Sequence, residues 1–71
     1  MNEKDIYTSI GKQIKLLRES KGLTQEKLAE KSGLSLDYIG KIEVSINKPG
    51  LKAIIKISGA LEVHIKELFD F

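Results

Sequence analysis

The sequence predicts an all-α fold built from five short helices. Apolar residues recur at intervals of three and four along most of the 71 residues, which is the period of one face of an α-helix. Glycine residues, or a loop that contains the single proline, separate these periodic blocks and act as stop signals. Only the segment 42–46 alternates apolar and polar residues as a strand would, and it falls at an expected helix end.

The first two helices are each followed by a glycine. The apolar stripe of the first helix consists of Ile6, Ile10, Ile14 and Leu17. We expect this helix to end near Lys21 and Gly22, because glycine readily adopts the left-handed conformation that terminates helices. Thr24 is a favoured N-cap residue for a second helix, which runs to about Lys31 and stops at Gly33.

Three further helices follow. Ser35 is the expected N-cap of a third helix that ends near Val44. Residues 44–50 form a loop, and Gly50 begins a fourth helix. The expected inner face of the fourth helix consists of Leu51, Ile54, Ile55, Ser58 and Leu61. A short fifth helix extends from His64 to about Asp70.

Length and composition limit the class of protein. A chain of 71 residues, 41% of them hydrophobic and 31% charged, corresponds to one small globular domain, residues 1–71. The longest apolar run is far too short for a membrane span, and no signal peptide is visible, so we expect a cytoplasmic location. The net charge of +2 does not by itself indicate nucleic-acid binding, so any anion-binding face must be local.

The sequence offers little for catalysis. It has no cysteine, one histidine and no run of carboxylates at metal-ligand spacing, so we predict neither an enzyme nor a bound metal or other cofactor. The histidine, His64, stands at a predicted helix start and reads as a surface or capping residue. Function must therefore be sought in a binding surface.

The most specific pattern is the segment of about residues 24–44, which has the features of a helix-turn-helix. In this motif two helices cross at a steep angle through a turn of about three or four residues. Ala29 is small where the second helix would cross the third, and Gly33 can supply the positive φ that the turn needs. Four apolar residues can hold both helices against the remaining ones, namely Leu28, Leu34, Ile39 and Ile42.

These residues resemble the phage repressor and Cro-like family of helix-turn-helix proteins, and the resemblance covers about residues 10–69. The matching residues are Gly11, Arg18, Gly22, Leu23, Thr24, Gln25, Leu28, Ala29, Gly33, Ser35, Ile39, Ile42, Glu43, Pro49, Ala60, Leu61, Val63 and Leu68. The resemblance implies a five-helix λ-repressor-like domain that binds palindromic operator DNA as a dimer and regulates transcription, usually as a repressor. No small-molecule ligand or membrane partner is implied.

The resemblance implies that the third helix, residues 35–44, lies in the major groove with Leu36, Asp37, Gly40 and Lys41 facing the bases. Asp37 can accept a hydrogen bond from cytosine N4, Lys41 can donate to guanine O6 or N7, and Leu36 can contact a thymine methyl group. Gly40 would permit close approach to the groove floor. Each residue also has a plainer interpretation: Asp37 stabilises the first helical turn, Leu36 covers the core edge, and Gly40 is a neutral surface position.

The groups that hold phosphates need not read any base. Gln25 opens the second helix, where the free backbone N–H groups and the helix dipole favour an anion. Tyr38, Asn47 and Lys48 are further candidates because the third helix and the loop after it flank the groove, although each would also suit a solvated surface. We expect Thr24 and Ser35 to be caps first and phosphate ligands second.

The resemblance assigns two structural roles. Arg18, the only arginine, pairs with Glu43 in a partly buried ion pair that joins the first helix to the third. The fifth helix carries a large apolar load for one short helix, at Ile65, Leu68, Phe69 and Phe71. These four residues either form a homodimer interface or close the core of the monomer.

Two positions depart from the family pattern. The family usually has a glycine two residues after the glutamate of the third helix, where this sequence has Ser45, and a glycine at the end of the fourth helix, where it has Glu62. We expect both helix ends to lose their left-handed cap, at about 1 kcal/mol each. The conformation of the loop 44–50 therefore cannot be deduced from the sequence.

A second reading of the same motif stays open. A helix-turn-helix can serve as a protein-binding adaptor or antitoxin with weak affinity for DNA. The small net charge, and the acidic and apolar side chains of Asp37 and Leu36, favour this reading.

Overall fold

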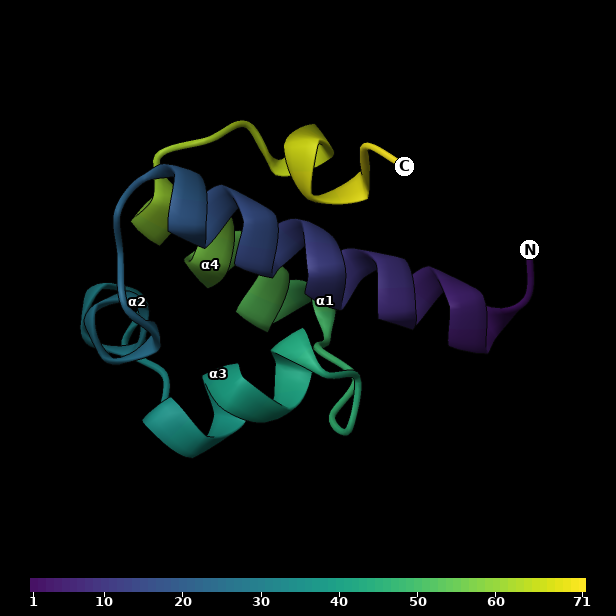
Figure 1. Ribbon diagram of the computed structural model, residues 1–71, viewed down its shortest axis with the longest axis horizontal. Coiled ribbons are helices and arrows are strands. Elements are labelled where there is room, and N and C mark those ends of the chain that lie inside the picture. Colours follow the sequence, from purple (N-terminus) through teal and green to yellow (C-terminus); the bar gives the residue numbers. More distant parts are fainter.

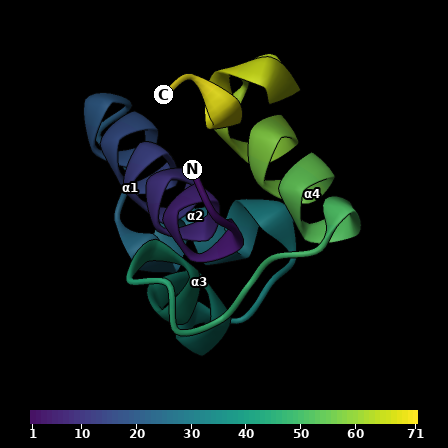
Figure 2. The ribbon, with the colours of Figure 1, turned by 90° about the vertical axis from the view of Figure 1, so that its right-hand side faces the viewer.

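The computed structural model describes residues 1–71 and contains four α-helices and a final 3-10 helix. The elements are α1 (Glu3–Ser20), α2 (Gln25–Ser32), α3 (Leu36–Glu43), α4 (Leu51–Leu61) and the 3-10 helix η1 (Ile65–Phe69). In Figure 1, α1 crosses the molecule with η1 above it and α3 below it, and in Figure 2 α1 and α4 lie on opposite sides above α3. The prediction of an all-α fold is confirmed.

The last element differs from the expected α-helix His64–Asp70. The backbone N–H of Glu67 donates to the carbonyl oxygen of His64 at 2.9 Å, an i to i+3 bond that winds the chain more tightly than an α-helix. His64 is the N-cap, since its Nδ1 accepts from the N–H of Lys66 at 3.3 Å. The interpretation of His64 as a capping residue is therefore confirmed.

The other helix starts follow from their caps. Asn2 Oδ1 accepts from the N–H of Asp5 at 2.9 Å, so α1 begins at Glu3, one turn before the predicted apolar stripe. Thr24 Oγ1 accepts from the N–H of Lys27, and Ser35 Oγ accepts from the N–H of Tyr38, both at 3.0 Å. The predicted starts of α2 and α3 are confirmed.

The core lies where α1, α2, α3, α4 and η1 meet. It consists of Ile10, Ile14, Leu28, Ala29, Ile39, Ile42, Ile54, Ile57, Leu61 and Leu68. Three predicted inward residues, Ile6, Leu51 and Ile55, are exposed instead. Ile6 and Leu51 lie in end turns that no other helix covers, and Ile55 is rotated by about 100° from Ile54 around the helix axis. On α4 the buried positions are instead Ala53, Ile54, Ile57, Ser58 and Leu61.

All four α-helices end in the same way. In each, a backbone N–H donates to the carbonyl oxygen five residues earlier, at 2.8–3.2 Å: Leu23 to Arg18, Leu34 to Ala29, Ile46 to Lys41 and Val63 to Ser58. The residue before each donor has positive φ, and these residues are Gly22, Gly33, Ser45 and Glu62. The expectation that α3 and α4 lose the left-handed cap is wrong, because non-glycine residues adopt it at φ of 64° and 57°. Gly33 supplies the positive φ of the helix-turn-helix, as predicted.

We therefore expect Glu62→Gly to stabilise the fold by about 0.5–1 kcal/mol. A side chain in the left-handed region carries a steric penalty that glycine lacks, and this gain exceeds the greater entropy of glycine in the unfolded chain. Thermal unfolding followed by circular dichroism measures the effect. Glu62→Ala removes the carboxylate but keeps Cβ, so it should give no such gain, and an equal rise in both variants would contradict the backbone explanation.

Candidate nucleic-acid interface

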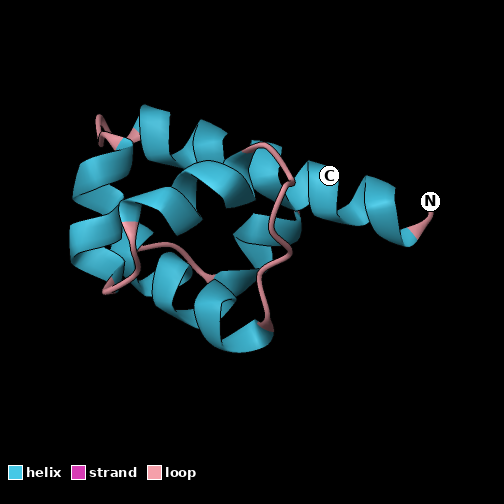
Figure 3. Ribbon diagram, turned by 90° about the horizontal axis from the view of Figure 1, so that it is seen from below, coloured by secondary structure: helices cyan, strands magenta, loops and turns pink.

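The outer surface of α3 is exposed at Leu36 and Asp37 and half-buried at Gly40 and Lys41. Its inner side buries Ile39, Ile42 and Glu43, and its outer side carries the predicted base-reading residues. Leu36 has 47% of its surface exposed, so it covers the core edge only in part. Figure 3 views the molecule from the side on which α3 lies in Figure 1. A ligand with a wide groove can therefore receive α3 without displacing another helix of the protein.

Two of these residues contact each other. Lys41 Nζ lies 3.0 Å from Asp37 Oδ2, one helical turn away, and the side chains are 45% and 75% exposed. Gly40 sits beside them, and a Cβ at this position would meet only Gln25 Oε1, at an ordinary 3.6 Å. Packing within the protein therefore does not require glycine at position 40, which leaves its proposed role in close approach to DNA open to test.

The candidate phosphate ligands flank α3. The hydroxyls of Thr24 and Ser35 cap α2 and α3 as acceptors, and each keeps a proton to donate. Gln25 Nε2 donates to Glu43 Oε1 at 3.0 Å, so one of its amide protons is already engaged inside the protein. Asn47 is half-buried in the loop after α3, and its backbone N–H donates to the carbonyl oxygen of Lys41 at 3.2 Å.

The surroundings of Tyr38 include two lysines that the sequence analysis did not identify as candidates. Tyr38 lines a shallow cavity of about 320 Å³ together with Leu34, Gly50, Lys52, Ala53 and Lys56. Lys52 and Lys56 are one turn apart on the exposed side of α4. The only sequence signal for them was this i, i+4 spacing, which has no meaning until the fold places the start of α4 beside Tyr38.

Lys48 is held by the start of α1. Its Nζ lies 2.8 Å from Glu3 Oε2 and 5.5 Å from the centre of the Tyr7 ring. The hydrogen bond from Lys48, with its charge, lowers the pKa of Glu3, and the same contact raises the pKa of Lys48. Because the pKa of Glu3 is lowered, the stabilisation from this contact is present above the ordinary value of 4.5 and is lost as the pH falls through the folded value. A phosphate that binds Lys48 must compete with Glu3.

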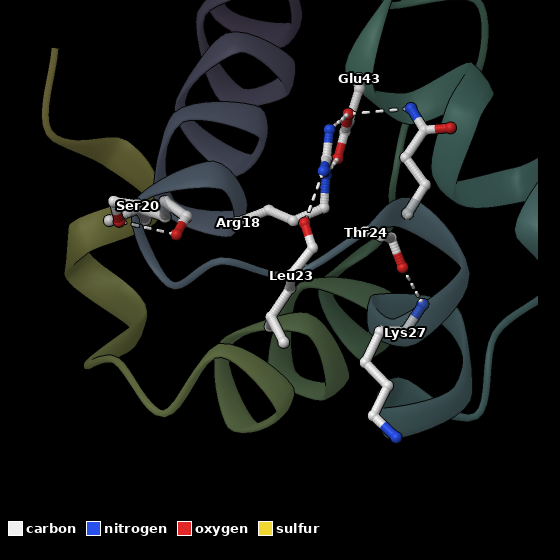
Figure 4. Close-up of polar contacts among 8 residues, drawn as sticks. Arg18, Ser20, Leu23, Thr24, Lys27 and Glu43 are labelled. Carbon is white, nitrogen blue, oxygen red and sulfur yellow. Dashed lines mark hydrogen bonds and ion pairs between the residues drawn. The ribbon is translucent and has the colours of Figure 1, made fainter.

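Behind the interface, a buried ion pair fixes the end of α3 to α1 (Figure 4). Arg18 Nε donates to Glu43 Oε2 at 2.7 Å, and Nη2 donates to Oε1 at 3.1 Å. Arg18 Nη1 also donates to the carbonyl oxygen of Leu23 at 2.7 Å, in the turn before α2. The hydrogen bond to Glu43 raises the pKa of Arg18, against the opposing effect of desolvation. The pair thus orients α1, α2 and α3 together.

The four predicted dimer residues separate into two groups. Leu68 has no exposed surface, so it belongs to the monomer core and cannot contact a second copy. Ile65 packs partly against that core, whereas Phe69 and Phe71 are exposed. η1 packs against α1 and α4, with Leu68 on its buried side and Phe69 on its exposed side, and Phe71 lies beyond its end.

Three of the exposed apolar residues, Ile6, Leu51 and Phe69, share one groove. This open groove of about 480 Å³ is lined mainly by Ile6, Tyr7, Pro49, Leu51, Ile54 and Phe69. Figure 2 shows α1, α4 and η1, which supply most of these residues, lying above α3. Because no residue of α3 lines the groove, it lies on another side of the molecule from the outer surface of α3.

No three histidine, cysteine, aspartate or glutamate side chains gather where they could hold a metal ion. None of the helices is both long enough and apolar enough to cross a membrane. A bundle of this kind, with a helix-turn-helix whose second helix is exposed on its outer side, defines the class of helix-turn-helix DNA-binding proteins.

Comparison with known proteins identifies the family. The chain matches the helix-turn-helix family HTH_3 over residues 14–68, and it belongs to this family of Cro/C1-type regulators. It is 42% identical over 62 residues to the transcriptional regulator SlrR of Bacillus subtilis, and 35% identical over 60 residues to the immunity repressor of Bacillus phage phi105. These matches cover 86% and 84% of the chain, but only 41% and 42% of the relatives, so the chain spans less than half of their length.

A solved structure agrees over the whole fold. The restriction-modification controller protein C.AhdI from Aeromonas hydrophila superposes with a TM-score of 0.87 at 38% identity, over 89% of this chain and 96% of that one. The chain therefore has both the sequence pattern and the fold of a helix-turn-helix domain of this family.

Proposed function

We propose that this chain is a DNA-binding transcriptional regulator that binds a palindromic operator as a homodimer and represses transcription. The observation that carries the proposal is the outer surface of α3, where the Leu36, Asp37 and Lys41 side chains reach the solvent. In a helix-turn-helix this surface enters the major groove, and its side chains contact bases while the flanking elements contact phosphates. The likeness to a phage immunity repressor supports repression over activation.

The flanking groups can supply the phosphate contacts. The Thr24, Gln25 and Ser35 side chains stand at the starts of α2 and α3, where backbone N–H groups and the helix dipole also favour an anion. Tyr38 lies in the first turn of α3, and Asn47 and Lys48 lie in the loop after it. Lys52 and Lys56 join these candidates because they share a cavity with Tyr38. Together these groups would fix the register of α3 on the duplex.

A second copy of the chain would bind at the apolar groove. The side of the molecule that carries Ile6, Leu51, Phe69 and Phe71 is apolar and exposed, and burying it would remove this surface from water. The groove lies on another side of the molecule from the outer surface of α3. A two-fold axis beside the groove can therefore leave both α3 helices on one face of the dimer. Two recognition helices about 34 Å apart then reach successive major grooves, which predicts a palindromic operator.

Leu51→Glu should convert the dimer to a monomer. Leu51 is 68% exposed at the first turn of α4, where the helix dipole favours a carboxylate. The substitution should therefore preserve the fold and remove the apolar contact between the two copies. Sedimentation equilibrium with and without DNA measures the change. Leu16→Glu is the matched control, because Leu16 is equally bare on α1 but does not line the groove. A wild-type chain that stays monomeric on DNA would remove the dimer from the proposal.

Salt dependence tests DNA binding itself. A dimer that neutralises about six phosphates should lose affinity with a log–log slope of about −5. The alternative, a protein-binding adaptor or antitoxin, is favoured by one observation: Lys41 and Lys48 are both already paired with carboxylates. An adaptor would show little DNA binding at any salt concentration. Selection of bound sequences from a random DNA pool then reports the operator, and Lys41→Ala should weaken preference among sequences.

A further inference from the structure

The acidic and basic residues at the outer surface of α3, Asp37 and Lys41, contact each other and do not act as two separate groups. Lys41 Nζ and Asp37 Oδ2 are 3.0 Å apart, and the two side chains are 45% and 75% exposed. Gly40, between them in sequence, has no side chain that could separate the pair from a DNA surface. The pair therefore presents a hydrogen-bond donor and an acceptor side by side.

Both kinds of base pair offer a hydrogen-bonded donor and acceptor in the major groove, but only a G·C pair has a second acceptor directly beside the first. In the major groove, guanine offers the acceptors O6 and N7, and cytosine offers the N4 amino group as donor. O6 and N4 are hydrogen-bonded to each other, so they lie about 2.9 Å apart. This spacing matches the 3.0 Å between Lys41 Nζ and Asp37 Oδ2.

We propose that Asp37 and Lys41 read one G·C base pair as a single unit. Lys41 has three donors, so it can keep its contact with Asp37 and still donate to guanine O6 and N7. Asp37 has spare acceptor capacity on its carboxylate and accepts from cytosine N4. This inference rests on the proposed function, since it requires α3 to enter the major groove.

Each partner depends on the other. Without Asp37, the long side chain of Lys41 is free to move to the nearest phosphate, so affinity remains but base preference is lost. Without Lys41, the carboxylate of Asp37 faces the DNA polyanion alone and is repelled from the groove, so binding weakens and the contact with cytosine N4 is lost. Both single changes therefore remove the preference at the same base pair.

The test is a double-mutant cycle on the selected operator. Binding by fluorescence anisotropy is compared between this DNA and a copy in which one G·C pair of each half-site is replaced by A·T. The wild-type chain should prefer G·C by about tenfold or more at that position. Asp37→Ala, Lys41→Ala and the double variant should each bring this ratio close to one, so the second change adds nothing to the first.

Two controls separate this effect from others. Lys27 and Glu30 form a comparable exposed ion pair on α2, at 3.2 Å, and replacing either with alanine should leave the ratio unchanged. Loss of preference at two different base pairs, with additive effects, would overturn the inference and leave the proposed function standing. A wild-type chain with no sequence preference would overturn both.

Discussion

Replacing Arg18 with alanine should lower the free energy of unfolding by about 3–5 kcal/mol. The Arg18 and Glu43 side chains are only 9% and 1% exposed, so the carboxylate left behind has no access to water. Gln25 Nε2 would be its single remaining hydrogen-bond partner. The turn before α2 would also lose the hydrogen bond from Arg18 to the carbonyl oxygen of Leu23.

Thermal unfolding by circular dichroism should show a midpoint at least about 12 °C lower for Arg18→Ala, since each kcal/mol shifts a domain of this size by about 4–8 °C. Lys27→Ala breaks the exposed pair with Glu30 and should change stability by no more than about 0.5 kcal/mol. If Arg18→Ala does not fold, Arg18→Met combined with Glu43→Leu should regain much of the loss, because no buried charge then remains. An unchanged midpoint for Arg18→Ala would contradict a stabilising role for this pair.

The parts of this fold that the sequence could predict depend on local physics. The caps at Thr24 and Ser35 and the turn at Gly33 each involve only a few neighbouring residues, so residue type was enough to locate α2 and α3. The winding of η1 was not predictable in this way. Periodicity over five residues does not distinguish an α-helix from a 3-10 helix, and packing against α1 and α4 decides which form is adopted.

Exposure at helix ends was the main source of error. Ile6 and Leu51 lie on the correct stripes, yet no neighbouring helix reaches far enough to cover them. The sequence pattern records which face of a helix is apolar, but not how far along the helix the rest of the molecule extends. Leu68 shows the reverse case, because an apolar residue near the chain end is fully buried. The exposed groove could therefore be located only from the structure.

The residues of the candidate site also fall into those that local sequence could place and those that only the folded chain brings together. The helical period was enough to place Asp37 and Lys41 on one surface of α3, four residues apart. The involvement of Gln25 with Glu43, and of Lys48 with Glu3, joins residues 18 and 45 positions apart in sequence. Such contacts depend on side-chain conformations and on the path of the loop 44–50, for which a single sequence carries no local signal.

Gly11 is the residue whose importance the sequence concealed. It matches the family pattern, but nothing local explains a glycine in the interior of α1, where alanine would favour the helix. In the structure, a Cβ at this position would overlap the carbonyl oxygen of Ile42 and lie 3.1 Å from that of Glu43. Both obstacles are backbone atoms at the end of α3, so neither can move aside by changing a side-chain rotamer. Gly11 therefore sets how closely α1 approaches the recognition helix.

We expect Gly11→Ala to destabilise the fold by about 2–3 kcal/mol, since the steric penalty outweighs a gain of about 0.5–1 kcal/mol in helix propensity. Gly59→Ala is the matched control, because a Cβ there meets nothing within 4 Å and should stabilise α4. Denaturant unfolding measures both variants, which make the same chemical change with opposite expected signs. If Gly11→Ala were as stabilising as Gly59→Ala, the close crossing of α1 and α3 would be wrong, and with it the position of the surface that meets DNA.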